Sequence, residues 1–545
     1  MLAKFKIIMD RPWEKTAFYL LFVLAVTLFL MQMLSLYTTP IPDSYLWWGD
    51  ESWLMIEFRT QILEGIFRHP YALASSIEHG SGLLFGNMWV PALFYGIPAA
   101  VLRNHAVDII TIGRSVTALL AVTLLLSTYE IIYKLTSERI IALFGVILLL
   151  SSRSFLFTSH SARYDILTAL AILIGIYLSL QLIARDELKW RQAALIGFGT
   201  AATVLITVHV TITIGLAVFA SVLLCSSGNR TQNAIAFIGS SLLFILLLIG
   251  LSELRGQLSL FGGSAQNSYY LNLHDIPAFR PFSRSVQVAN LVQRWKIFSA
   301  LGLGYLITLL ALVAPALYGL WTKRFSFHIT SHVTILLIAI ASWLLFESSA
   351  PTSYLIYILP PLSVAIALSV HTLLPHPAGR WLIIPTGVIL CLFGFADAPF
   401  SHSVGASVSK QNEKAIDAAL AMVEQENPNS RPLVLAFNPA VHRVLRDTNV
   451  RLMTTHFVEF PQASELEVRS TQDIILKENV QYILLYRSAI KPDYMREAQP
   501  IAAVAHSMGT LVFEDTGYFT DIGRSYFSTT MGLPDTIQVY RLSEP

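Results

Sequence analysis

The stretch YDILTALAILIGIYLSLQLI (164–183) carries one charged residue, Asp165, near its start and is otherwise almost wholly apolar. A helix of about 20 apolar residues crosses the hydrocarbon core of a bilayer, so this stretch predicts a membrane span. The stretch 192–226 is long enough for two short spans that turn near His209. Other runs of this kind lie at 17–36, 107–133, 138–158, 231–252, 297–320, 329–346, 353–374 and 380–397. We therefore expect a multispan α-helical membrane protein with about eleven transmembrane helices.

The composition of the whole chain agrees with this interpretation. Of 545 residues, 54% are hydrophobic and only 13% are charged, whereas soluble domains carry about 25% charged residues. This excludes one large soluble domain and excludes a disordered chain. Lys and Arg number 37 against 35 Asp and Glu, and such a balance gives no reason to expect a nucleic-acid partner.

The positive charges predict which side of the membrane each segment faces. Lys4, Lys6, Arg11 and Lys15 precede the first run, which is interpreted as a retained anchor that starts in the cytoplasm. Every short inner loop is basic if PALFYGIPAAVL (91–102) is an interfacial or re-entrant helix and does not span the membrane. The loops 37–106 and 253–296 and everything after about 398 then face outward, and we expect the chemistry on that side.

Residues 401–545 have the composition of a separate soluble domain, and residues 1–400 form the transmembrane part. SHSVGASVS (401–409) is a polar linker, and 411–424 has helical spacing. Four strands are expected, at 431–437, 451–458, 480–486 and 535–542. Alternating strands and helices predict a C-terminal soluble α/β domain. It would serve as a scaffold or would dock an acceptor.

The first outer loop opens with the acidic pair Asp50-Glu51, inside WWGDESW (47–53). Asp50 is a candidate general base at the membrane surface. It could equally cap the amphipathic helix expected over 51–66, because an aspartate there accepts hydrogen bonds from free backbone N–H groups.

Three further charged residues lie near outer helix ends. Arg163 could reach lipid headgroups or bind a phosphate, and Asp165 could cap the helix 166–183, orient Arg163 or help to position a metal. Arg114 lies inside an apolar run, where an arginine usually faces a partner or a cavity. It could pair with Asp108 or Asp165 or face an anionic ligand.

The remaining candidates are spread over the outer segments. Arg280 and Arg284 belong to a basic loop that could attract membrane lipids or clamp a lipid phosphate. His79 is expected to make polar or acceptor contacts, since no histidine pair has the spacing of a helical zinc site. Tyr354 and Tyr357 precede Pro360-Pro361, where interfacial anchoring is the default role of a tyrosine.

Taken together, these features resemble integral-membrane glycosyltransferases of the C-type fold, and specifically the bacterial group similar to dolichyl-phosphate-mannose protein mannosyltransferases and aminoarabinose transferases. The matching features are Asp50-Glu51 after the first span, GRSVTALLAVTLLL (113–126), RYDILTALAIL (163–173) and YLIYILPPLSVAIAL (354–368). The resemblance covers roughly residues 10–400. EHGSGLLFGNMW (78–89) departs from it, because the family often has Lys or Arg with a His-Pro pair there.

The resemblance implies sugar transfer from a polyprenyl-phosphate-linked donor to a lipid, glycan or protein acceptor outside a bacterial inner (plasma) membrane. Asp50 would be the general base of an inverting reaction. Arg114, Arg163 and Arg280 or Arg284 would stabilise the leaving phosphate. Glu51 and Asp165 would orient the site or assist a divalent metal.

Two other functions compete with this one. A transporter or lipid flippase would place its polar site near the bilayer midplane, whereas the charges here collect at outer helix ends. A receptor-like or structural protein whose tail binds a partner would not need Asp50, Arg114, Arg163 and Asp165 to converge.

Overall fold

A computed structural model describes a large part of the chain in separate stretches. They are 12–38, 50–64, 89–102, 109–159, 161–183, 188–206, 208–225, 229–254, 356–373, 383–392, 394, 414–436, 451–454, 472–473, 475–477, 479–487, 498–519 and 533–542. Several predictions fall outside these stretches and are not tested by them. They concern the spans 297–320 and 329–346, the linker 401–409, and His79, Arg280, Arg284 and Tyr354.

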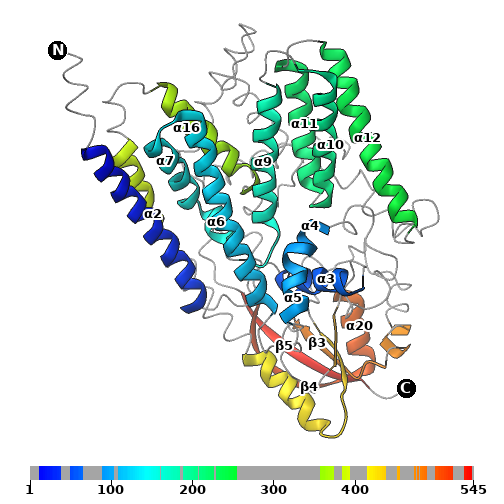
Figure 1. The fold of residues 1–545 in the computed structure, drawn as a ribbon. Helices are drawn as coiled ribbons and strands as arrows, with labels where there is room; N and C mark the ends of the chain where they lie inside the picture. The colour runs from blue at the N-terminus through cyan, green and yellow to red at the C-terminus, as the bar shows by residue number, and fades with distance from the viewer. Residues whose placement is uncertain are drawn as a thin grey trace, which may run out of the picture.

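Most of the described residues before 400 form upright apolar helices that stand side by side (Figure 1). Four of these helices are long and apolar enough to cross a membrane. They are α2 (Pro12–Thr38), α6 (Ile109–Thr136), α9 (Asp165–Ile183) and α12 (Arg230–Leu254). Shorter helices stand among them: α7 (Arg139–Leu150), α10 (Trp190–Ala202), α11 (Val208–Cys225), α16 (Leu359–Leu373) and Ile383–Leu392. Apolar side chains from most of these helices share one hydrophobic core.

The predicted single span over 138–158 is wrong, because the structure breaks it into two helices. α7 ends at Leu150 and α8 (Arg153–Thr158) begins three residues later. The hydroxyl of Ser152 accepts a hydrogen bond from the backbone N–H of Phe155 at 3.1 Å, and so caps α8. Serine is favoured at such positions because its side chain satisfies a backbone donor that a helix start leaves open.

The two short helices expected within 192–226 are present as α10 and α11. A 3₁₀ turn, η4 (Thr203–Leu205), separates them, so the chain turns just before His209. The hydroxyls of Thr203 and Thr211 lie 2.9 Å apart across this turn and hold the two helices together.

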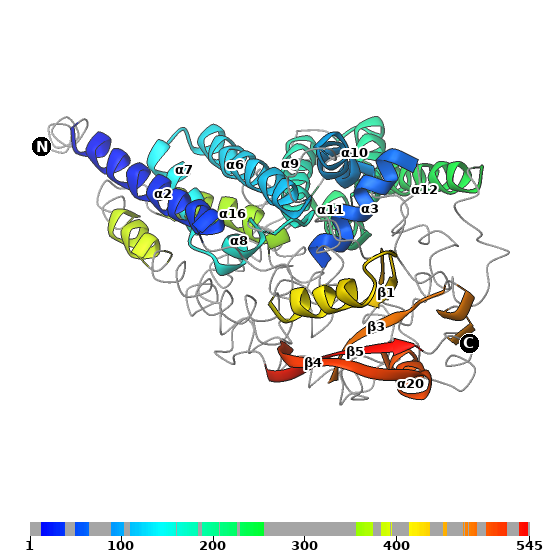
Figure 2. The ribbon, with the colours of Figure 1, turned by 90° about the horizontal axis from the view of Figure 1, so that it is seen from below.

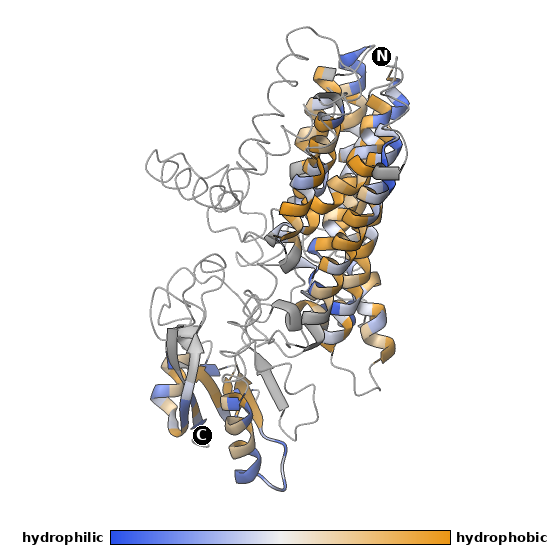
Figure 3. Ribbon diagram, turned by 90° about the vertical axis from the view of Figure 1, so that its left-hand side faces the viewer, coloured by the Kyte–Doolittle hydropathy of each residue, from blue (hydrophilic) through white to orange (hydrophobic). Residues whose placement is uncertain are grey.

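Charged residues lie at both ends of the helix bundle. The last turn of α6 and the first turns of α7, α10 and α12 form what we call the basic end, where Lys134, Arg139, Arg191 and Arg230 lie. The first turns of α6 and α9 form the opposite end, which we call the sheet end because the strands of the tail lie beyond it (Figure 1). Colouring by hydropathy shows a mostly apolar bundle between these ends (Figure 3). Arg114 and Arg163 lie at the sheet end, so arginines occur at both ends, and the predicted sidedness stays a prediction.

Two helices of the first loop pack together at the sheet end. α3 (Asp50–Glu64) matches the helix expected over 51–66, and the segment 91–102 forms α4 (Trp89–Pro91), a π-helical turn η2 (Ala92–Gly96) and α5 (Ile97–Val101). A β-carbon added to Gly96 would lie 2.3 Å from the backbone oxygen of Phe58. Glycine is therefore required for α3 and η2 to approach this closely.

The tail holds a five-stranded mixed sheet with strand order β2-β1-β3-β5-β4. β2 (Arg451–Thr454), β1 (Leu433–Ala436) and β3 (Tyr482–Tyr486) run parallel to one another. β5 (Leu533–Leu542) is antiparallel to both of its neighbours, β3 and β4 (Gly509–Phe519). The first three and β5 overlap the four predicted strands, whereas β4 was not predicted. The sheet and its helices lie beside the bundle (Figure 2).

Helices cover both faces of this sheet. Val434 and Ala436 of β1 pack against the helix 414–426, and Leu433 and Leu435 pack with α20 (Ala498–Met508) on the opposite face. Successive strand side chains point to opposite faces, so a strand covered on both sides is apolar throughout. This explains the unbroken run LVLA of β1.

Candidate functional site

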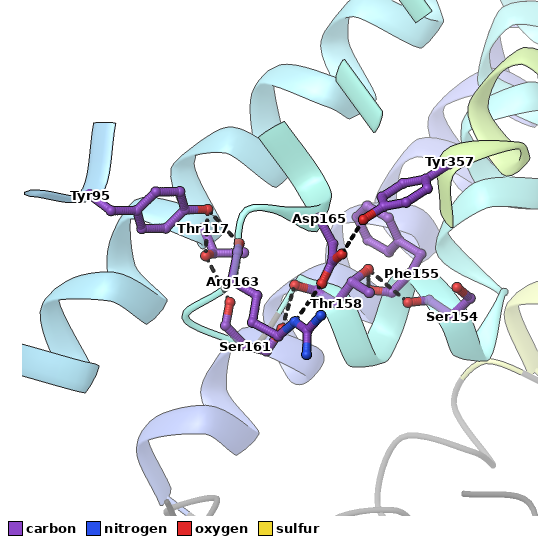
Figure 4. Close-up of polar contacts among 9 residues, drawn as sticks. All are labelled: Tyr95, Thr117, Ser154, Phe155, Thr158, Ser161, Arg163, Asp165 and Tyr357. Carbon is purple, nitrogen blue, oxygen red and sulfur yellow. Dashed lines mark hydrogen bonds and ion pairs between the residues drawn. The ribbon is translucent and has the colours of Figure 1, made fainter. Parts of the chain in front are cut away.

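A buried cluster of polar side chains lies at the sheet end of the bundle, around the start of α9 (Figure 4). Nε of Arg163 donates to Oδ2 of Asp165 at 2.8 Å, and the hydroxyl of Tyr357 donates to Oδ1 of the same carboxylate at 2.5 Å. The side chains of Arg163 and Asp165 are only 4% and 0% exposed. We call Arg163, Asp165 and Tyr357 the polar centre.

The chain between α8 and α9 is folded so that Arg163 turns back towards Asp165. The backbone N–H of Arg163 donates to the carbonyl of Ser161 at 2.7 Å, which closes a tight three-residue turn. The hydroxyl of Thr158 bonds back to the carbonyl of Ser154 at 2.7 Å, one turn earlier in α8. Buried hydroxyls on this segment thus satisfy their hydrogen bonds locally.

The polar centre shows which contacts Arg163 and Asp165 make. Arg163 does not reach out to headgroups, because its side chain is buried against Asp165. Asp165 opens α9, and its two carboxylate oxygens accept hydrogen bonds from Arg163 and Tyr357. Opposite charges in contact lower the cost of holding either one in an apolar surrounding.

The other predicted site residues that the structure describes lie on neighbouring elements. Arg114 is half-buried in the first turns of α6. Asp50 and Glu51 open α3, whose Met55 packs on Gly113 of α6. Asp50 therefore lies about 7.5 Å along α3 from this contact, at about 1.5 Å per residue.

The structure leaves part of the predicted site open. Arg280, Arg284, His79 and Tyr354 lie outside the described residues, and so do the contacts of the Asp50 and Glu51 side chains. Within the part of the chain that is described, no group of three His, Cys, Asp or Glu side chains could hold a metal ion.

Sequence reasoning missed several residues around the polar centre. Tyr95 of η2 and Thr117 of α6 contact the turn that carries Arg163. Sequence reasoning also missed that Glu57 and Gln61 of α3 are buried. No local sequence pattern signals the contacts of Tyr95 and Thr117, because each joins segments that lie far apart in the chain.

This arrangement suits the binding of an anion next to an apolar surface. Nε of Arg163 donates to Asp165, and the arginine side chain is buried. Arginine offers forked N–H donors that match phosphate oxygens, and a preorganised donor stabilises negative charge that develops nearby.

Comparisons with known proteins show the fold. No protein-family model matches the chain, and no curated protein sequence does. Two crystal structures of ArnT from Cupriavidus metallidurans, one bound to undecaprenyl phosphate and one in the apo state, are similar to it with a TM-score of 0.54. The similarity covers 95% of this chain and 97% of ArnT, at 11% sequence identity. The chain therefore has the fold of the aminoarabinose transferase ArnT, a multispan membrane protein of the C-type glycosyltransferase fold.

Proposed function

We propose that this protein is a membrane glycosyltransferase that transfers a sugar from a polyprenyl-phosphate donor to an acceptor at the outer face of the membrane. The observation that carries the proposal is the buried Arg163–Asp165–Tyr357 centre at the sheet end of an apolar bundle. A solved structure with the same fold is bound to undecaprenyl phosphate. Apolar helices suit a prenyl chain, and the arginine suits its phosphate.

In the proposed reaction, the acceptor hydroxyl oxygen attacks the anomeric carbon of the donor sugar. A carbon–oxygen bond forms to the acceptor while the bond to the phosphate oxygen breaks, which inverts the anomeric centre. Polyprenyl phosphate leaves with the bonding electron pair, and Asp50 takes the proton of the acceptor hydroxyl. A carboxylate placed within reach of that proton acts as the general base.

The other charged residues take supporting roles in this scheme. Arg163 stabilises the charge on the leaving phosphate, together with Arg114 and with Arg280 or Arg284 of the second outer loop. Asp165 holds the Arg163 guanidinium, and Tyr357 holds Asp165, because both Arg163 and Tyr357 donate hydrogen bonds to the Asp165 carboxylate. Glu51 orients the acidic end of α3. His79 and Tyr354 contact the donor or the acceptor.

The basic residues at one end of the bundle support an outward location for this chemistry. The basic end has the charge expected for the cytoplasmic side of a bacterial inner membrane. The sheet end, with the polar centre and the tail, then faces outward. A donor that is already activated as a phosphate ester and anchored in the membrane suits this side, where nucleotide sugars are absent. The acceptor is a lipid, a glycan or a protein.

The experiment uses the full chain in lipid nanodiscs with radiolabelled undecaprenyl-phosphate sugars, one pentose, hexose or aminopentose at a time. A cell-envelope extract serves as the acceptor. We expect the native protein to release undecaprenyl phosphate from one of these donors and to label the extract. Asp50→Asn should lower the rate by about 100-fold or more, because general-base catalysis contributes about that much.

Asp515→Asn is the matched control, since Asp515 is an exposed carboxylate on β4 of the tail. It should keep the native rate. Sugar transfer at the native rate by Asp50→Asn would remove this residue as the base. Movement of the intact donor between the leaflets, without release of undecaprenyl phosphate, would identify a lipid flippase and overturn the proposal.

A further inference from the structure

Tyr95 reaches from the first-loop segment into the turn that carries Arg163. Its hydroxyl donates to the backbone carbonyl of Arg163 at 2.7 Å and lies 3.0 Å from the hydroxyl of Thr117 (Figure 4). Both side chains are fully buried. Tyr95 thus links η2 to the backbone of the residue whose guanidinium faces Asp165.

Thr117 holds the same turn from the other side. Its hydroxyl donates to the carbonyl of Ser161 at 2.8 Å, and it also lies 3.1 Å from the carbonyl of Gly113 in its own helix. Ser161 and Arg163 are the two residues that close the turn, because the Arg163 N–H donates to the Ser161 carbonyl. Each end of the turn is therefore bound by one hydroxyl.

The number of hydroxyl protons determines which carbonyl each hydroxyl can serve. Each hydroxyl has one proton to donate. The pair satisfies the carbonyls of Ser161 and Arg163 at once only when Tyr95 donates to Arg163 and Thr117 donates to Ser161. Loss of the Tyr95 hydroxyl removes the side-chain donor of the buried Arg163 carbonyl, and loss of the Thr117 hydroxyl leaves the Ser161 carbonyl with the Arg163 N–H as its remaining described donor. Losing a hydrogen bond to a buried carbonyl is costly in an apolar surrounding.

Close packing fixes the positions of both hydroxyls. The ring of Tyr95 stacks on Phe58 of α3 with centroids 5.8 Å apart, and Phe58 also meets the ring of Tyr164 edge-on at 6.3 Å. A β-carbon added to Gly113, one helical turn before Thr117, would lie 2.6 Å from the β-carbon of Ala162. The 161–163 turn therefore packs directly against α6, and α3 packs against both α6 and Tyr164, the residue that follows the turn.

We propose that Tyr95 and Thr117 are positioning residues that hold the 161–163 turn, so that the Arg163 guanidinium meets its phosphate ligand in a fixed orientation. This inference rests on the proposed function for the identity of that ligand. The contacts by which Tyr95 and Thr117 hold the turn do not depend on the proposed function. Because Phe58 belongs to α3, the same contacts tie the position of the arginine to the helix that begins with Asp50-Glu51.

The first test measures the turn itself. Amide hydrogen exchange is followed over residues 159–166 in nanodiscs for the native chain, Tyr95→Phe, Thr117→Val and the control Thr128→Val. Thr128 is also fully buried in α6, but its hydroxyl bonds to Leu124 of its own helix. We expect Tyr95→Phe and Thr117→Val to raise exchange in this segment at least about fivefold and Thr128→Val to leave it unchanged. Unchanged exchange in both Tyr95→Phe and Thr117→Val overturns the inference.

The second test asks whether Tyr95 acts through Arg163. Binding of undecaprenyl phosphate is measured by native mass spectrometry for Tyr95→Phe, Arg163→Gln and the double variant. Tyr95→Phe should weaken binding about fivefold in the native background and have no further effect when Arg163 is already Gln. The same fivefold loss in both backgrounds would indicate general damage and overturn the inference. If Arg163→Gln alone binds undecaprenyl phosphate normally, the proposed phosphate site fails, and the exchange measurement still decides whether the two hydroxyls hold the turn.

Discussion

The helix bundle and the tail each contain an arginine paired with a carboxylate, and the two pairs differ in nearly every physical respect. In the bundle, Arg163 and Asp165 are 2.8 Å apart, with side chains 4% and 0% exposed. In the tail, Arg541 and Glu426 are 3.5 Å apart, with side chains 52% and 32% exposed. The same two types of group thus occur once in an apolar interior and once against water.

The two pairs differ in the free-energy cost of keeping their charges in the folded protein. An exposed pair is solvated whether or not it forms, so it contributes little to stability. A buried pair must satisfy its charges within the protein, because water does not reach it. The polar centre is therefore the stronger candidate for function, and variants at both pairs can test this contrast.

The largest effect is expected when the buried pair is broken. Arg163→Ala should destabilise the protein by about 3–5 kcal/mol, because Asp165 is left as an uncompensated buried charge. Thermal unfolding in detergent measures the loss. The double variant Arg163→Met/Asp165→Asn removes both charges and should recover most of the stability but none of the sugar transfer. Equal stability of Arg163→Ala and the native chain would contradict the contrast.

A smaller effect is expected when the carboxylate loses its second partner. Tyr357→Phe keeps the ring and removes the hydrogen bond to Oδ1 of Asp165. A hydrogen bond to a charged group is worth about 1.5–3 kcal/mol, so transfer should fall by about 10-fold or more. Tyr482→Phe is the control in the tail, where the tyrosine hydroxyl donates to Glu426. Similar losses of transfer in both variants would remove Tyr357 from the site.

The close packing beneath the polar centre can be tested with two glycines. Gly113→Ala would place a β-carbon 2.5 Å from the sulfur of Met55 and 2.6 Å from Ala162, and such overpacking costs about 1–3 kcal/mol. Gly239→Ala in α12 meets no described atom within 4 Å. It should stabilise its helix by about 0.5–1 kcal/mol. Opposite shifts of the unfolding temperature are the expected result, and shifts of the same sign would contradict it.

The smallest effect is expected at the exposed pair. Arg541→Gln removes a contact that water screens, so stability should change by at most about 1 kcal/mol. Transfer should keep the native rate. Unfolding at low and high salt checks the screening, because any small loss should disappear in high salt. A loss as large as that of Arg163→Ala would show that burial does not separate the two pairs.

The sequence predicts those parts of the structure that depend on local pattern. Helix α9 and strand β1 follow from long apolar runs, and the helix over α3 follows from its amphipathic spacing. Strand β4 escapes prediction because GTLVFEDTGYF alternates poorly and contains Glu514-Asp515. The break between α7 and α8 falls at the polar stretch SSRS (151–154), where the Ser152 hydroxyl caps α8.

The candidate site follows the same division. Arg163 and Asp165 could be predicted because charges beside apolar runs are conspicuous. Tyr95 and Thr117 could not, because their partners are backbone carbonyls that have no sequence signature. The contact between Tyr357 and Asp165 joins residues 192 positions apart, and spacing along the chain carries no information about such a contact.

That separation along the chain has a consequence for biosynthesis. Arg163 and Asp165 are two residues apart, so both leave the ribosome almost together and can enter the bilayer as a neutral pair. At about 5–20 residues per second, Tyr357 follows roughly ten to forty seconds later. The Arg163–Asp165 pair can thus enter the membrane before Tyr357 is synthesised. Tyr357 then adds the hydrogen bond that completes the geometry of the polar centre.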